Sequence, residues 1–119
     1  MFIRELLDCD EIAAGDNCML REILHPDKED LQLRYSLAHA VVRPGDTTWE
    51  HRLRTSEVYY IMEGEGIMHI NGESAPVRAG STVYIPPLAR QCITNPGRID
   101  LKFICIVDPA WRREDEEVL

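Results

Sequence analysis

The sequence predicts a single all-β domain, either a sandwich or a barrel. The chain has 119 residues and a mass of 13.7 kDa, which suits one hydrophobic core. Its residues are 45% hydrophobic and 29% charged, a composition typical of a packed domain rather than a disordered segment. Short apolar runs alternate with Gly, Pro and Asn turn signals about every 8 to 12 residues or less, which is the spacing of antiparallel strands.

The expected strands are the apolar runs that stop at a turn signal. They cover residues 35–42, 58–62, 67–70, 83–85, 92–94 and 101–107. Glu63-Gly64 is interpreted as a two-residue hairpin turn, which would pair Tyr59 with Met68. In that register Tyr59 and Met68 face inward, while His69 points outward.

The expected domain organisation is a barrel with an extension at each end. Residues 1–34 are expected to form an N-terminal strand extension, with an outer strand in 18–24, that packs on the barrel or on a dimer partner. Residues 35–109 form the barrel. Residues 110–119 are expected to form a charged C-terminal tail, either solvated or folded as a short helical turn.

Charge and hydropathy exclude two classes of partner. The formal charge of −8 and the pI near 4.9 argue against nucleic acid, because phosphate binding needs a basic face. No apolar run approaches the roughly 20 residues that a membrane-spanning helix needs. The first residues carry acids where a signal peptide is basic, so we expect a cytoplasmic protein.

The four cysteines are Cys9, Cys18, Cys92 and Cys105, and none forms a CxxC pair. In a reducing compartment we expect small buried side chains rather than disulfides.

Residues 101–107 predict self-association. This run is apolar on both faces apart from Lys102, so Ile104 and Ile106 would face outward. A strand of that kind lies between two layers or against a second subunit, and we therefore expect a homodimer.

The chemistry-bearing residues cluster in residues 44–64 and 79–95. Side chains of equal parity share one face of a strand, so His51, Leu53 and Glu57 are expected to point together into the barrel. An imidazole and a carboxylate aimed into one cavity are suitable ligands for a divalent ion.

These stretches resemble the two motifs of the cupin superfamily, GxxxxxHxHxxxExxxxxxG and GxxxxxPxGxxHxxxN. The positions that match the motifs at every spacing are Gly45, His51, Glu57 and Gly64 in the first, and Gly80, Pro86 and Asn95 in the second. The resemblance implies a double-stranded β-helix, a jelly-roll barrel. In members with a full ligand set, three histidines and the glutamate hold Fe, Mn, Ni, Zn or a related ion.

The sequence departs from the motifs at three positions: Leu53 and Gln91 replace histidines, and Leu88 replaces a glycine. The resemblance therefore retains His51 and Glu57 as ligands, with Gln91 as a weaker third donor through its amide oxygen. The alternative is that Gln91 hydrogen-bonds Glu57 or His51 in a metal-free pocket, because a buried carboxylate needs partners.

The other histidines are weighed as further ligands. His69 faces outward in the expected hairpin, and His25 lies in a loop before Pro26. The strand parity of His39 is not fixed, so its membership of the site stays open.

Strand alternation also predicts which other side chains point into the barrel. Most of them are expected to be core residues rather than ligand contacts. The predicted pocket residues are Leu53, Tyr59, Ile61, Met68, Val83, Ile85, Leu88 and Ile93. Tyr59 stands out because a buried phenol needs a partner, and with Glu57 it is a candidate catalytic residue.

The leading hypothesis is a small cupin that binds a divalent metal and a small organic ligand. The resemblance implies a metal-dependent oxygenase or a sugar-phosphate-type isomerase, without naming the reaction. The alternative is a metal-free binding module whose cavity is enlarged by Leu53 and Leu88. A third hypothesis is an assembly role through the dimer.

Overall fold

The computed structural model describes residues 1–119 and contains eleven strands and two short 3-10 helices. The strands are β1 (Glu11–Ala13), β2 (Met19–Leu24), β3 (Ser36–Val42), β4 (His51–Leu53), β5 (Ser56–Glu63), β6 (Glu65–Ile70), β7 (Glu73–Arg78), β8 (Thr82–Ile85), β9 (Gln91–Thr94), β10 (Leu101–Asp108) and β11 (Glu116–Val118). The 3-10 helices are η1 (Leu6–Asp8) and η2 (Arg113–Asp115). No helix is long and apolar enough to cross a membrane.

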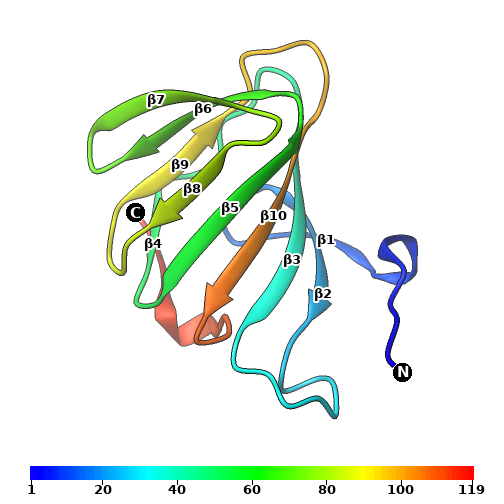
Figure 1. Cartoon of the computed structure of the whole chain (residues 1–119). Coiled ribbons are helices and arrows are strands. Elements are labelled where there is room, and N and C mark those ends of the chain that lie inside the picture. Colours follow the sequence, from blue (N-terminus) through cyan, green and yellow to red (C-terminus); the bar gives the residue numbers. More distant parts are fainter.

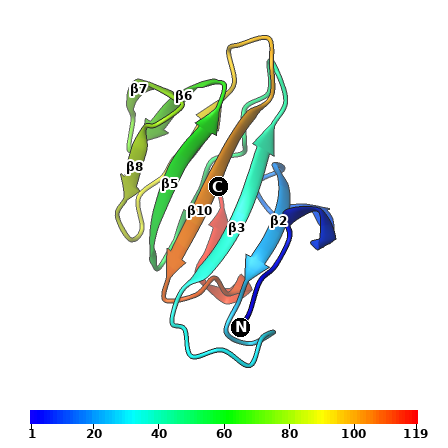
Figure 2. The same ribbon diagram turned by 45° about the vertical axis from the view of Figure 1, so that its right-hand side comes forward.

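The strands form two antiparallel sheets that face each other as a barrel (Figure 1). One sheet has the order β1-β2-β3-β10-β5-β8, and the other has the order β11-β4-β9-β6-β7. Figure 2 shows β2, β3, β10 and β5 side by side in the first sheet. The predicted all-β jelly-roll fold is therefore confirmed.

The connection from β5 to β6 corrects the predicted hairpin. β5 pairs with β10 and β8, whereas β6 pairs with β9 and β7, so the chain changes sheets at Gly64. Gly64 has φ +86°, and a Cβ there would lie 2.7 Å from the carbonyl oxygen of Asp100. Tyr59 and Met68 are nevertheless buried inside, because strand alternation orients them without any direct pairing.

Apolar side chains from both sheets fill one end of the barrel. Phe103, Ile61, Ile93 and Leu101 are at most 1% exposed and belong to one hydrophobic cluster. The Tyr59 and Phe103 rings lie 4.4 Å apart between centroids at the border of this cluster. We call this region the closed end. The four cysteines are free thiols, and three of them are buried.

Segments near both ends of the chain extend the sheets. β2 pairs with β3, and β1 pairs with β2. The charged run near the C-terminus contains the expected short turn, η2, but it continues into β11, which pairs with β4. The pairing of Val118 with His51 brings this run beside the predicted site instead of leaving it as a solvated tail.

Candidate functional site

A cavity of about 270 Å³ lies between the sheets at the end opposite the closed end. Twelve of its twenty lining residues are hydrophobic. The lining residues that bear on function are Asp16, Cys18, Glu22, Lys28, Ala38, His51, Leu53, Glu57, Tyr59, Phe103, Cys105, Trp111 and Glu116. This open end brings polar and apolar side chains together around a space large enough for a small molecule.

His51 and Glu57 both reach this cavity, although they come from different sheets. His51 begins β4 and is 3% exposed, and Glu57 lies on β5 and is 7% exposed. Both side chains point inward because they occupy buried positions of alternating strands. The site thus places an imidazole and a carboxyl group on the wall of one enclosed space.

A chain of hydrogen bonds joins the lining residues Tyr59 and Glu57 through Gln91, which is buried but does not line the cavity. The Tyr59 hydroxyl donates to Gln91 Oε1 at 3.1 Å, and Gln91 Nε2 donates to Glu57 Oε1 at 3.1 Å. The Gln91 oxygen thus accepts from the phenol, and its amide nitrogen faces the carboxyl group. This is the interaction between Gln91 and Glu57 that the metal-free alternative describes.

Burial dominates the electrostatics of Glu57. Desolvation raises its pKa to about 8, and the nearby Asp16 and Glu116 carboxylates act in the same direction. The hydrogen bond from Gln91 opposes this shift only in part. Burial also raises the pKa of Tyr59, so the phenol stays protonated and remains a donor.

His51 presents one unused ring nitrogen to the cavity. Its Nδ1 lies 3.0 Å from the carbonyl oxygen of Trp49, and because a carbonyl only accepts, Nδ1 carries the proton. Nε2 makes no hydrogen bond, and its nearest charged neighbour is Asp16 Oδ2 at 3.8 Å. The second nitrogen is therefore available to a ligand.

Asp16 is a site residue that sequence reasoning missed. It lies in the turn between β1 and β2, where its Oδ1 accepts from the backbone N–H of Cys18 at 3.2 Å. Its carbonyl oxygen accepts from the N–H of Trp49 at 2.9 Å, which fixes this turn beside β4. The Gly15-Asp16-Asn17 sequence indicates a turn, but nothing local in it shows that the turn covers the cavity.

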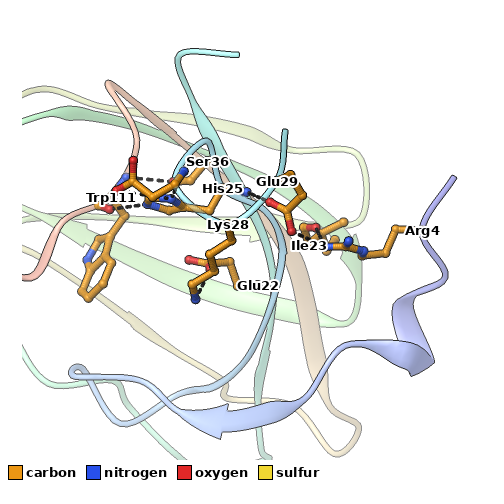
Figure 3. Close-up of polar contacts among 9 residues, drawn as sticks. Arg4, Glu22, Ile23, His25, Lys28, Glu29, Ser36 and Trp111 are labelled. Carbon is orange, nitrogen blue, oxygen red and sulfur yellow. Dashed lines mark hydrogen bonds and ion pairs between the residues drawn. The ribbon is translucent and has the colours of Figure 1, made fainter. Parts of the chain in front are cut away.

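Trp111 and Glu116 also line the cavity, and they too were missed. The indole Nε1 of Trp111 donates to Glu116 Oε2 at 3.3 Å. The backbone of Trp111 is held in place by His25 Nε2, which donates to its carbonyl oxygen at 2.7 Å, and by Ser36 Oγ, which accepts from its N–H at 2.9 Å (Figure 3). A Cβ at Gly15 would meet Glu116 Oε1, so the β1–β2 turn and the Glu116 side chain are neighbours at the cavity.

The residues present do not fit the metal centre that the family resemblance implies. Leu53 lines the cavity and has no lone pair to offer. Gln91 turns its amide nitrogen, which has no lone pair for a metal, toward Glu57. No group of three or more His, Cys, Asp or Glu side chains is arranged to hold a metal ion.

The remaining predicted pocket residues divide between cavity, core and surface. Leu53 and Tyr59 line the cavity. Ile61, Met68, Ile85 and Ile93 are packed in the hydrophobic cluster, and Val83 packs against it. Leu88 is a correction: it is 57% exposed in the loop after β8, where its φ of +67° turns the side chain away from the barrel.

Two histidines lie outside the site. His39 is buried on the outer face of β3, because its neighbours Ala38 and Ala40 face inward, so it does not join His51. Burial lowers the pKa of His39. His69 contacts the hydroxyls of Ser74 and Thr94 at 2.7 and 3.0 Å, on the side of β6 opposite the buried Met68.

The Cupin domain family matches residues 38–107, more than half of the chain. The chain belongs to the cupin family. A protein of Methanocaldococcus jannaschii, MJ1618, is 41% identical over 105 residues, which cover 87% of this chain and 83% of that protein. The oxalate-binding protein of Thermotoga maritima is 34% identical over 65 residues, 54% of each chain.

Solved cupin structures agree on the fold. The cupin 2 conserved barrel protein of Salinispora arenicola superposes with a TM-score of 0.80 at 23% identity, over 96% of this chain and 91% of that one.

The mannose-1-phosphate guanylyltransferase of Salmonella montevideo is 31% identical over 103 residues, but these are only 22% of its length. Asp16, Trp111 and Glu116 lie outside the residues that the family match covers.

Proposed function

We propose that this cupin binds a small organic molecule in the open-end cavity through His51 and Glu57, without a metal ion held by His51, Glu57 and Gln91. The observation that supports this proposal is the Tyr59–Gln91–Glu57 hydrogen-bond chain, in which Gln91 turns its amide nitrogen rather than its oxygen toward Glu57. The proposal corresponds to the metal-free alternative drawn from the sequence. The cavity volume of about 270 Å³ lies just below the usual range for protein pockets, about 300–1,000 Å³, and suits a small ligand.

Metal binding, which the leading sequence hypothesis required, would cost this cupin two interactions. Gln91 would have to turn its oxygen instead of its amide nitrogen toward Glu57, and Glu57 would have to lose the proton that its raised pKa retains near neutral pH. Breaking a buried hydrogen bond costs about 1–3 kcal/mol when one partner is left unsatisfied. The metal-dependent oxygenase and isomerase hypotheses both require that cost to be offset.

Elemental analysis by mass spectrometry tests the proposal. Protein purified without chelator, and protein reconstituted with Mn²⁺, Fe²⁺, Ni²⁺ or Zn²⁺ and then desalted, should each hold less than about a tenth of an equivalent of metal. Loading near one equivalent that disappears in His51→Ala and Gln91→Ala would overturn the proposal. Arg52→Ala, whose side chain pairs with Glu117 outside the cavity, serves as the matched control.

A second candidate function is proton-transfer catalysis on the bound ligand. It is favoured by a carboxyl group that is protonated near neutral pH and an imidazole Nε2 without a hydrogen-bond partner, both on the wall of one cavity. In D₂O, such an enzyme would place deuterium on a carbon of a bound hydroxy or keto compound, detectable by NMR. Exchange that persists in Glu57→Gln and His51→Gln would contradict this candidate.

A further inference from the structure

The charges on the cavity wall are unbalanced. Four acidic residues line it, namely Asp16, Glu22, Glu57 and Glu116, against Lys28 and His51. Lys28 Nζ lies 2.6 Å from Glu22 Oε1, so these two side chains compensate each other at the rim (Figure 3). Gln91 donates to Glu57 and the Trp111 indole donates to Glu116, and His51 is the only other basic residue on the wall.

Two hydrogen-bond acceptors also lie close together on the cavity wall. In the neutral imidazole, His51 Nδ1 donates to the Trp49 carbonyl and Nε2 is an acceptor. Asp16 Oδ2 lies 3.8 Å from it, which is too far for a direct hydrogen bond. Both side chains are at least nine-tenths buried, so bulk water does not solvate this pair freely. A group with two N–H donors placed beside both atoms would satisfy them together.

The rest of the wall suits the body of an organic cation. Leu53 and Phe103 supply apolar surface, and the indole of Trp111 lies on the same wall with its N–H turned to Glu116. Aromatic faces attract cations, and carboxylates beside them strengthen that preference. An anion at the same place would meet repulsion from Asp16 and Glu116.

Resting on the function proposed above, we infer that the cavity selects a small organic cation, a primary or secondary ammonium group on an apolar body. The ammonium donates to His51 Nε2 and Asp16 Oδ2, and the apolar body contacts Leu53, Phe103 and Trp111. Glu116 adds negative charge at the rim. Because Asp16 and Glu116 lie outside the matched cupin region, this selectivity comes from the segments added to the barrel rather than from the barrel itself.

Three compounds of one chain length test the inference: pentylamine, pentan-1-ol and pentanoate, with oxalate as a fourth probe. Titration calorimetry and thermal unfolding at pH 7.5 should show binding and a raised Tm with pentylamine. Pentanol should bind at least about tenfold more weakly, because it lacks a charged donor, and the two anions should not bind.

Two variants connect the selectivity to the proposed contacts. Asp16→Asn keeps the oxygen that accepts from the Cys18 N–H, so the turn is retained, and should weaken pentylamine binding at least about tenfold. Glu116→Gln should weaken it severalfold. Glu117→Gln is the control, since this neighbour on β11 pairs with Arg52 on the surface and should leave affinity unchanged.

The outcomes separate this inference from the proposed function. Equal binding of pentylamine and pentanol, binding of the anions, no binding of pentylamine, or full affinity in Asp16→Asn would each overturn the cation inference while leaving a metal-free cavity. If Zn²⁺ or Mn²⁺ alone binds near 1:1 and displaces pentylamine, the proposed function itself fails.

Discussion

The closed end of the barrel interior, around Phe103 and Ile93, is filled by apolar side chains, whereas the open end, around His51 and Glu57, is left as a cavity. The same β-strand alternation builds both ends. β10 contributes to each, since it carries the buried Phe103 at their border and Cys105 and Val107 along the cavity. The orientation of side chains is thus common to both ends, and what differs is their size and polarity.

Small side chains leave the space at the open end. Ala13, Ala14, Cys18, Ala38 and Cys105 line the cavity beside a few larger apolar side chains such as Leu53 and Phe103. Burial raises the pKa of the Cys18 and Cys105 thiols, which keeps them protonated and unreactive. Stability therefore resides mainly at the closed end of the barrel and ligand chemistry at the open end.

The largest expected effect comes from emptying the closed end. Phe103→Ala should lower the free energy of unfolding by about 3–5 kcal/mol, because it removes a 1% exposed ring and leaves a void. Urea unfolding followed by circular dichroism measures the change. Ile106→Ala on the same strand, where the side chain is 37% exposed, should cost less than about 1 kcal/mol. Equal losses of unfolding free energy in the two variants would contradict the assignment of stability to the closed end.

Glu57→Gln should change how stability depends on pH. Burial raises the Glu57 pKa from 4.5 to about 8, so between these values the folded protein holds a proton that the unfolded chain releases. The stability contribution of this group is therefore complete below pH 4.5 and is lost as the pH rises through 8. Gln cannot titrate, so the variant should gain on the order of 2–4 kcal/mol relative to wild type between pH 5 and pH 8.5.

The measurement for this pH prediction is the difference in urea midpoint between variant and wild type across that range. Glu117→Gln, at an exposed position of β11, should show no such trend. A flat difference for Glu57→Gln would mean that Glu57 is ionised in the folded protein at pH 7.

Tyr59→Phe should have a smaller effect on the unfolding free energy, and it tests what Tyr59 does for Gln91. The variant leaves Gln91 Oε1 without its donor inside the barrel, at a cost of about 1–2 kcal/mol in unfolding free energy. Tyr60→Phe, on the same strand but 48% exposed, is the matched control and should be neutral within about 0.5 kcal/mol. Metal loading gained by Tyr59→Phe would show that the phenol is what keeps Gln91 from acting as a ligand.

The homodimer stays a prediction, and it concerns the outside of the same strands. Ile104 is half-buried and Ile106 is 37% exposed on the outer face, near Tyr60 and Met62 of β5, which are 48% and 49% exposed. We expect light scattering to give twice the mass of the chain, and Ile106→Glu to shift the molecules toward monomers without changing the interior. A monomer at high concentration would contradict the prediction.

Much of the barrel could be predicted because its determinants are local. Gly, Pro and Asn turn signals mark the strand ends, and parity places His51, Glu57 and Tyr59 inside. The β5–β6 pairing could not be predicted, because a glycine with positive φ serves a hairpin turn and a change of sheet equally well. Only long-range pairing decides between them.

The polar rim of the cavity could not be predicted for the same reason. Asp16 and Glu116 lie 100 positions apart in the numbering and meet only after β11 pairs with β4 and the β1–β2 turn is fixed to Trp49. Leu88 is a residue that was wrongly predicted to lie in the pocket. Its motif position indicates the interior, yet its backbone conformation turns it to the surface. Parity rules hold within strands and do not extend into loops.

The position of β11 in the chain has a consequence for biosynthesis. Translation delivers the strands of the barrel first, and Trp111 and Glu116 follow them. A nascent chain paused just after β10 would therefore have every strand of the matched cupin region but only part of the wall that surrounds its ligand.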